Sequence, residues 1–287
     1  MTVEQLSATG AVTYSQCPRK FYWQRVERWQ RSGATEVNAM SLGSMTHWLI
    51  EQGLSYALEN DACKPKHFSM TAITHAMREI DTYIASNYES DISQGRAYEE
   101  QVPYARQMAL NLFMWMEAEG FFERYEVISM EKEFEAGSYR CRPDIVVRDM
   151  IVDVYGVFDF KTSTNLNQEV MNSDWQMRMM AIVLEEALRK PMAFGGHIRI
   201  KKIKDTKRAK PPYVELKEMR FDEKRLDIAR KEIHDLMWRI EQDVVWLPNP
   251  HWTCASSCGY YDACEAKTAG QDWEYVLGTT HERKVNE

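Results

Sequence analysis

The residues best suited to chemistry are two acids and a lysine near the middle of the chain. Asp144 ends the run Arg142-Pro143-Asp144, and Asp159-Phe160-Lys161 lies in the next strand-like segment. Alternate residues of a strand point to the same face, so Asp159 and Lys161 project together while Phe160 points into the core. If the two strands pair, both carboxylates and the ammonium converge at one end of a sheet. Mg²⁺ or Mn²⁺ would relieve the repulsion between the carboxylates.

The reaction predicted from these three groups is hydrolysis of a phosphodiester. A water bound to such a cation has a lowered pKa and acts as the nucleophile. The lysine can orient that water or offset charge on the phosphate. The simpler alternative is a surface ion pair at a strand end, worth less than about 1 kcal/mol. The D-x-K pattern is weak by itself, and the Pro-Asp pair upstream strengthens it.

A histidine on a predicted helix is a further candidate ligand. His47 and Glu51 are four residues apart within the helix predicted over 41–59, so they share one face. Imidazole is a good ligand for Mn²⁺ or Mg²⁺ when carboxylates supply the negative charge. A single helical histidine is more often a surface or core residue, so the case for His47 depends on the groups that accompany it.

Four cysteines are candidates for a second centre. Cys254, Cys258 and Cys264 have the spacing C-x3-C-x5-C, which leaves a four-coordinate site one ligand short. Cys17 is the natural fourth ligand, and the centre would then hold the N-terminal helix against the C-terminal segment. Zn²⁺ and a [4Fe–4S] cluster both take four thiolates, and the spacing does not choose between them. The alternative is that these cysteines are unrelated reduced thiols.

The elements that must position these groups follow from hydrophobic periodicity. We expect helices over 14–30, 41–59, 69–88, 98–121, 168–190 and 222–246, and strands over 125–135, 139–148, 151–161, 193–203 and 212–221. This order predicts an α/β fold with a central mixed sheet flanked by helices and a helical N-terminal region. We expect one domain over 1–287, made of a helical part (1–122), a catalytic sheet core (123–221) and a C-terminal helix with the cysteine segment (222–287). The last twenty residues are polar, and we expect them to be loose.

Composition narrows the class of protein. The chain has 287 residues, of which 44% are hydrophobic, and a net charge of −7. The charge argues against a protein that coats nucleic acid through its whole surface. No run of about 18 apolar residues predicts a membrane span, and no apolar stretch near the N-terminus predicts a signal peptide. We therefore expect a cytoplasmic protein, in the bacterial host if a phage encodes it, with cysteines that bind a metal centre rather than form disulfides.

In combination, the motifs resemble a known family. Their order is S-x-C-P-R-x-F, G-x3-H-x3-E, R-P-D, D-F-K-T, a glutamine on the following helix and the cysteine trio, and they run from residue 14 to 266. This order resembles the PD-(D/E)XK nuclease superfamily, and within it the RecB-type iron–sulfur nucleases. That clade includes CRISPR-associated adaptation exonucleases, the nuclease domain of AddB-type helicase–nucleases and many bacteriophage exonucleases.

The resemblance implies a restriction-endonuclease-like core and a role for each matched residue. The ligands of Mg²⁺ or Mn²⁺ would be His47, Asp144, Asp159 and the main-chain carbonyl of Phe160. Lys161 would be the catalytic lysine, and Gln176 would be the glutamine of a Q-x-x-x-Y motif that contacts DNA or that lysine. Cys17, Cys254, Cys258 and Cys264 would hold a [4Fe–4S] cluster.

Three positions qualify the resemblance. The tyrosine of the Q-x-x-x-Y motif is replaced by Met180. The first gap of the cysteine trio is three residues where many relatives have two, so zinc remains an alternative. Glu131 matches a glutamate often found before the Asp strand, and we assign it no catalytic role.

The expected substrate is DNA. Basic residues that could follow a phosphate backbone are Arg19, Lys20 and Arg25, which are interleaved with aromatic residues, and Lys201 and Lys202 in a predicted hairpin. By resemblance we expect a metal-dependent exonuclease acting on single-stranded ends with 5′→3′ polarity in phage or bacterial recombination, repair or replication. A recombination or annealing protein would be its partner, and an oligomer would fit processive action. The alternatives are a flap endonuclease on the same scaffold and a non-catalytic DNA-binding or assembly module.

Overall fold

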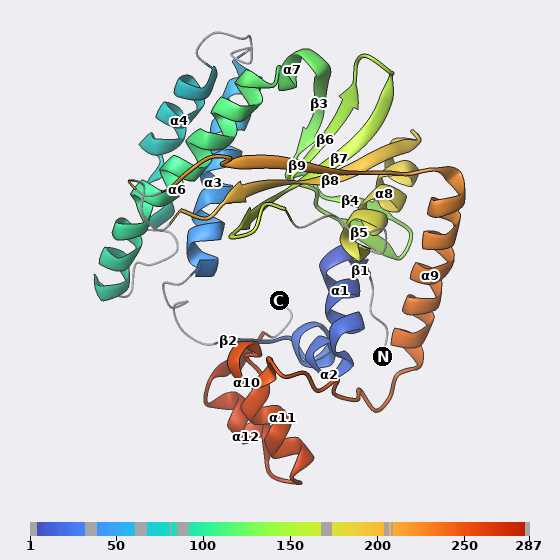
Figure 1. Cartoon of the computed structure of the whole chain (residues 1–287). Helices are drawn as coiled ribbons and strands as arrows, with labels where there is room; N and C mark the ends of the chain where they lie inside the picture. Colours follow the sequence, from blue (N-terminus) through green and yellow to red (C-terminus); the bar gives the residue numbers. More distant parts are fainter. Residues whose placement is uncertain are drawn as a thin grey trace.

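A five-stranded mixed sheet forms the centre of the computed structural model, which describes residues 5–31, 39–60, 68–80, 82–84, 92–167, 174–203, 207 and 209–284. The strand order is β3-β6-β7-β8-β9 (Figure 1). The strands are β3 (Tyr125–Met130), β6 (Ile145–Asp149), β7 (Val154–Ser163), β8 (Met192–Lys201) and β9 (Val214–Arg220). Strands β7 and β8 are parallel and the other neighbours are antiparallel. This confirms the predicted α/β class with a central mixed sheet.

The helices of the first part of the chain cover one face of the sheet (Figure 1). They are α3 (Ala39–Glu59), α4 (Phe68–Arg78), α6 (Ile92–Ala118) and the short α7 (Phe121–Arg124). Their apolar faces form one core with the sheet, in which Leu49 and Phe113 share a cluster with Phe158 and Phe160 of β7. Phe160 thus lies on the buried face that alternation predicts for it.

The opposite face is covered by α8 (Trp175–Leu188), α9 (Glu223–Gln242) and α1 (Ala8–Gln16). Val157 of β7 packs there with Met180 and Leu236. The Asp174 side chain caps α8 by accepting a hydrogen bond from the Met177 main-chain N–H at 3.0 Å. A small second sheet, β1 (Leu6–Ser7), β5 (Tyr139–Cys141) and β4 (Phe134–Ala136), joins this layer.

Residues from both ends of the chain form a separate group of short elements (Figure 1). They are α2 (Pro18–Phe21), the π-helix η1 (Tyr22–Val26), β2 (Trp29–Arg31), α10 (Cys254–Ser257), α11 (Tyr261–Thr268), α12 (Trp273–Gly278) and β10 (His281–Arg283). Trp23 lies at its centre, 1% exposed, and its ring stacks on Trp273. We call this group the terminal cap.

Five sequence predictions about elements are corrected. The helix predicted over 14–30 is broken at Cys17 and ends in strand β2, and the strand predicted over 125–135 is divided between β3 and β4 in different sheets. The strand predicted over 139–148 is two strands, β5 and β6, in different sheets, because Arg142-Pro143-Asp144 interrupts the ladder. The last residues are not all loose, since α12 is a helix and β10 pairs with β2 in antiparallel register. Helix α9 ends at Gln242 rather than near 246.

Two predicted helices extend beyond what the structure describes. The start of the predicted helix 168–190 and the end of the predicted helix 69–88 lie partly outside the described residues. Within the described part of the chain, no helix is both long and apolar enough to cross a membrane.

Candidate active site

The two strands that carry the acids pair as the sequence predicts. Strands β6 and β7 are antiparallel, and Ile145 lies opposite Phe158. This register places Asp144, just before β6, beside Asp159. The Phe160 main-chain N–H donates a hydrogen bond to Asp144 Oδ2 at 2.5 Å, so the two segments are tied together at the site.

Lys161 and Gln176 complete a closed network with Asp159. Lys161 Nζ lies 2.6 Å from Asp159 Oδ2 and donates to Gln176 Oε1 at 3.0 Å. Gln176 Nε2 in turn donates to Asp159 Oδ1 at 2.7 Å. The glutamine is in the first turn of α8, so this helix positions both the acid and the amine. The predicted contact between Gln176 and the lysine is present.

His47 reaches the acids from α3. A Cβ atom at Gly43, one turn earlier, would lie 3.1 Å from Thr162 Oγ1, so glycine permits the close approach of the helix to β7. His47 Nδ1 lies 3.8 Å from Asp144 Oδ2, and the Phe160 carbonyl accepts a hydrogen bond from the imidazole. Burial lowers the pKa of His47. The ring is therefore neutral at neutral pH, which is the form that binds a metal.

Glu131 lies in the same group of possible metal ligands, although its sequence position predicted no catalytic role. Ligand atoms of His47, Glu131 and Asp144 all lie within 4.8 Å of one another. Glu131 follows β3 with a left-handed φ of 45°, and its N–H donates to the Asp144 carbonyl at 3.1 Å. Its position depends on the pairing of β3 with β6, so the motif match was the only signal in the sequence that could have indicated its role.

The positive charges of Lys161 and Arg142 compensate the acids only in part. Burial raises the pKa of Asp144 well above its usual value, and the negative charges of Asp159 and Glu131 raise it further. The pKa of Glu131 is also raised, by burial and then by Glu51. Carboxylate oxygens with one imidazole are a donor set that Mg²⁺ or Mn²⁺ accepts. A divalent cation therefore fits this group, because it would supply the positive charge that Lys161 and Arg142 do not.

The raised pKa of Asp144 leads to a prediction for Asp144→Asn without metal. A carboxyl whose folded-state pKa exceeds its usual value of 3.8 keeps its proton longer in the folded state. The metal-free wild type therefore loses stability as pH rises above this value. Asparagine removes the repelled charge and can still accept from Phe160. At pH 7 we expect a higher melting temperature for the metal-free variant, by roughly 2–4 °C per kcal/mol of relieved repulsion.

Calorimetric melting with and without Mn²⁺ checks this prediction. Mn²⁺ should stabilise the wild type and not Asp144→Asn. Asp153→Asn, in an exposed turn, is the matched control and should change little. A metal-free Asp144→Asn protein less stable than the wild type would contradict the expected repulsion.

The cysteines lie together in the terminal cap. Burial raises the pKa of Cys258, and Cys17 and Cys254 are near enough to raise it further. Cys258 and Cys264 border one apolar cluster, and Arg19 Nη1 donates to Cys264 Sγ at 3.4 Å. The N-terminal and C-terminal cysteines are thus close in space, as the predicted shared centre requires.

The basic residues predicted to contact DNA differ in their surroundings. Arg19 is 9% exposed and also donates to Thr268 Oγ1 at 3.1 Å, so it links the two ends of the chain rather than facing solvent. Lys20 is half-buried and lowers the pKa of Cys258. Arg25 is exposed. Lys201 Nζ donates to the Lys210 carbonyl at 2.7 Å, and Lys202 is half-buried.

The aromatic residues near Arg19 do not form an open stacking surface as a group. Trp23 is enclosed between Trp273 and Tyr260 in the core of the terminal cap. The place of Trp23 in the sequence pattern therefore reflects packing within the terminal cap. Because its ring is buried, a DNA base cannot stack on it.

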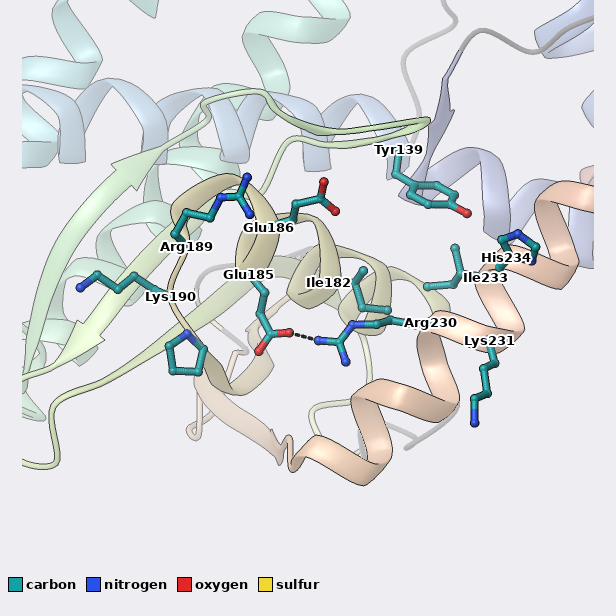
Figure 2. A pocket seen from close by; sticks show the side chains of 11 residues that line it. Tyr139, Ile182, Glu185, Glu186, Arg189, Lys190, Arg230, Lys231, Ile233 and His234 are labelled. Atoms are coloured by element: carbon teal, nitrogen blue, oxygen red, sulfur yellow. Dashed lines mark hydrogen bonds and ion pairs between the residues drawn. The ribbon is translucent and has the colours of Figure 1, made fainter.

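The structure has one pocket beside the proposed catalytic residues and another away from them. One of about 490 Å³ adjoins Lys161 and Gln176. A larger one of about 910 Å³ lies between α8 and α9, away from the acids (Figure 2). Glu185 and Arg230 form an ion pair across it. None of the residues discussed above as metal ligands lines the larger pocket, so its size does not mark it as the catalytic site.

Comparisons with known proteins agree with this geometry. The family model described as PD-(D/E)XK nuclease superfamily matches residues 5–265. We found no curated protein whose sequence matches this chain.

Solved structures give weaker likenesses. A protein from Eubacterium rectale, provisionally assigned as an exonuclease, has a TM-score of 0.40 and 10% identity over 89% of this chain and 94% of its own. An alkaline exonuclease from Laribacter hongkongensis has a TM-score of 0.31 and 11% identity over 48% of this chain and 80% of its own. Both likenesses are too weak to indicate a shared function. The match of the family model along most of the chain is sufficient: the chain belongs to the PD-(D/E)XK nuclease superfamily and is a deoxyribonuclease.

Proposed function

We propose that this protein is a Mg²⁺- or Mn²⁺-dependent exonuclease that hydrolyses single-stranded DNA from its ends. The observation that carries the proposal is the network in which Lys161 Nζ lies between Asp159 and Gln176, next to the group formed by His47, Glu131 and Asp144. Acids, an imidazole and an ammonium at one point are the groups that metal-assisted phosphodiester hydrolysis needs.

In this proposal His47, Asp144 and Asp159, with the Phe160 carbonyl, hold the cation, and Glu131 joins them. The cation would lower the pKa of a bound water and offset charge on the phosphate. Lys161 is held by an ion pair with Asp159 and a hydrogen bond to Gln176, so its ammonium has a defined position from which it can stabilise the transition state. Gln176 is a positioning residue, because it binds both Lys161 and Asp159.

The proposals for cleavage polarity, biological context and partner proteins are supported by the sequence resemblance. It favours 5′→3′ polarity and a context of recombination, repair or replication in a phage or bacterium. It also favours a partner that anneals or recombines DNA, and a ring-shaped oligomer would make cleavage processive. Of the basic residues, we propose Arg25, Lys201 and Lys202 as contacts to the strand. We leave out Arg19 because its guanidinium is committed to the terminal cap, and Lys20 because it lies against the cysteines.

We also propose that Cys17, Cys254, Cys258 and Cys264 hold a [4Fe–4S] cluster. The support for a cluster is the sequence resemblance, together with the proximity of Cys17 and Cys254 to Cys258. Zn²⁺, which also takes four thiolates, is the alternative. The Arg19 guanidinium and the His251 main-chain N–H, which donates to Cys254 Sγ at 3.2 Å, would tune such a cluster through the sulfurs.

Digestion of end-labelled DNA tests the exonuclease proposal. With Mn²⁺ we expect linear single-stranded DNA to be degraded to short products and circular single-stranded DNA to persist. Label at the 5′ end should be released first if the polarity is 5′→3′. Cleavage of circles would instead indicate an endonuclease on the same scaffold, and binding without cleavage would indicate a non-catalytic module.

A further inference from the structure

The pocket beside Lys161 and Gln176 has no role in the proposed mechanism. It lies where the parallel strands β7 and β8 end and α8 begins. Lys161 and Gln176 line it together with His197 and Arg199 of β8. Open α/β sheets bind ligands at the carboxyl ends of their strands, and helix N-termini favour phosphate groups.

The strand register explains why these residues are neighbours. Asp159 is paired with His197, and Lys161 is paired with Arg199 in the parallel ladder. Paired residues on adjacent strands project from the same face, at a strand separation of about 4.8 Å. His197 and Arg199 of β8 therefore lie side by side with Asp159 and Lys161 of β7 on the same face of the sheet.

His197 presents an unsatisfied donor to this pocket. Its side chain is 7% exposed, and its Nε2 atom has no hydrogen-bond partner among the described residues. Arg199 Nη2 lies 3.4 Å from His197 Nδ1. Because a guanidinium only donates, Nδ1 is the acceptor, and Nε2 carries the proton of the neutral ring. A buried donor without a partner is unfavourable, and an anionic oxygen in the pocket would satisfy it.

The carboxylates nearest to the pocket are Asp174 and Glu215. Asp174 Oδ1 caps α8, and Asp174 Oδ2 lies 3.7 Å from His197 Nε2, beyond hydrogen-bond distance. Glu215 lies opposite Arg199 on β9, with its Oε1 2.7 Å from Lys217 Nζ and its buried Oε2 accepting no hydrogen bond from the described residues. An anion in the pocket would lie beside Lys161, Arg199 and the His197 donor, which all line it.

We propose that this pocket binds the phosphate of the nucleotide next to the scissile phosphate, with Arg199 and His197 Nε2 as its ligands. The proposal rests on the proposed function, because it places the reacting phosphate beside Lys161. The shared chemistry is a nucleotide phosphate, which can be a terminal phosphomonoester or an internal phosphodiester.

Binding without cleavage is the first test. Thymidine 5′-monophosphate and thymidine are titrated into the metal-free protein by calorimetry. We expect the nucleotide to bind and the nucleoside not to bind, with the nucleotide affinity about tenfold or more lower in Arg199→Gln. Arg230→Gln removes a positive charge from the other pocket and should leave the affinity unchanged. Equal binding of nucleotide and nucleoside, no binding of the nucleotide, or an unaffected Arg199→Gln protein would overturn the proposal.

Kinetics on short single-stranded oligonucleotides is the second test. We expect Arg199→Gln to raise KM about tenfold or more while kcat changes less than about threefold. A defect that disappears with 5′-hydroxyl substrates assigns the pocket to a terminal phosphate, and a defect on both substrates assigns it to an internal one. An unchanged KM on both would contradict the subsite.

Two further variants guard against misfolding, because Arg199 is buried. If Arg199→Gln lowers the melting temperature, His197→Gln and Arg199→Lys carry the test. His197→Gln should lower nucleotide affinity, and Arg199→Lys should retain most of it. Nucleotide binding that depends on Arg199 in a protein that cleaves no DNA would refute the exonuclease function and leave the phosphate pocket standing.

Discussion

Replacing Lys161 with alanine is expected to lower kcat for DNA cleavage by about 10²–10³-fold while Mn²⁺ still binds. An ammonium that stabilises charge only as it develops in the transition state contributes to kcat and not to metal affinity. Lys161 is held 2.6 Å from Asp159 and 3.0 Å from Gln176, so its position is defined before substrate arrives. Single-turnover cleavage and Mn²⁺ titration measure the two quantities separately.

The matched control is Lys224→Ala. Lys224 is an exposed lysine in the first turn of α9, a helix that carries none of the site residues, so its loss removes the same charge away from the acids. It should retain near wild-type kcat. Gln176→Ala should fall between the two, because Lys161 then keeps only the Asp159 contact. Full activity of Lys161→Ala would remove the assigned mechanism even if the protein remains a nuclease.

Cys258→Ser is expected to cause the largest loss of stability. A centre that joins Cys17 to the C-terminal trio closes most of the chain into a loop, and such a closure contributes on the order of 4–5 kcal/mol in the chain-entropy estimate. Without it, the terminal cap keeps only contacts such as the Trp23–Trp273 stack and the β2–β10 pairing. Anaerobically prepared wild type should be brown, and the variant should be pale and should melt at a lower temperature.

Ser257→Ala is the control for this variant, because it changes the neighbouring residue and spares every cysteine. Its Oγ donates to the Thr253 carbonyl at 2.8 Å, so only one exposed hydrogen bond is lost. Its iron content should match the wild type. A colourless wild-type protein with one equivalent of zinc would overturn the iron assignment, and the proposed nuclease mechanism would remain open to its own tests.

Local patterns predicted the part of the site that lies on one strand. The alternation of Asp159, Phe160 and Lys161 follows from the period of a strand, and it places Phe160 in the core and the other two together. The pairing with the Asp144 segment was also foreseeable, since adjacent strands in sequence commonly pair. These features depend on neighbours within a few residues or on one short connection.

Residues whose roles depend on distant contacts were predicted less well. Glu131 reaches the site because β3 pairs with β6, and its left-handed backbone leaves no trace in a periodic pattern. Arg19 and Trp23 matched a DNA-binding composition, yet contacts with the C-terminal elements bury both. Strand β10 was missed because its partner β2 lies near the other end of the chain.

By itself, the sequence determined the residue types and their local periods: an acid and an amine on one strand face, a histidine on a helix, and four cysteines near the two ends. Only the tertiary structure decided which of these groups meet, that Glu131 joins His47 and Asp144, and that His197 and Arg199 line a pocket beside Lys161. The physical reason is the sequence separation over which each kind of interaction acts. Periodicity acts between residues a few positions apart, whereas strand register and helix packing join residues that only the complete set of buried contacts brings together.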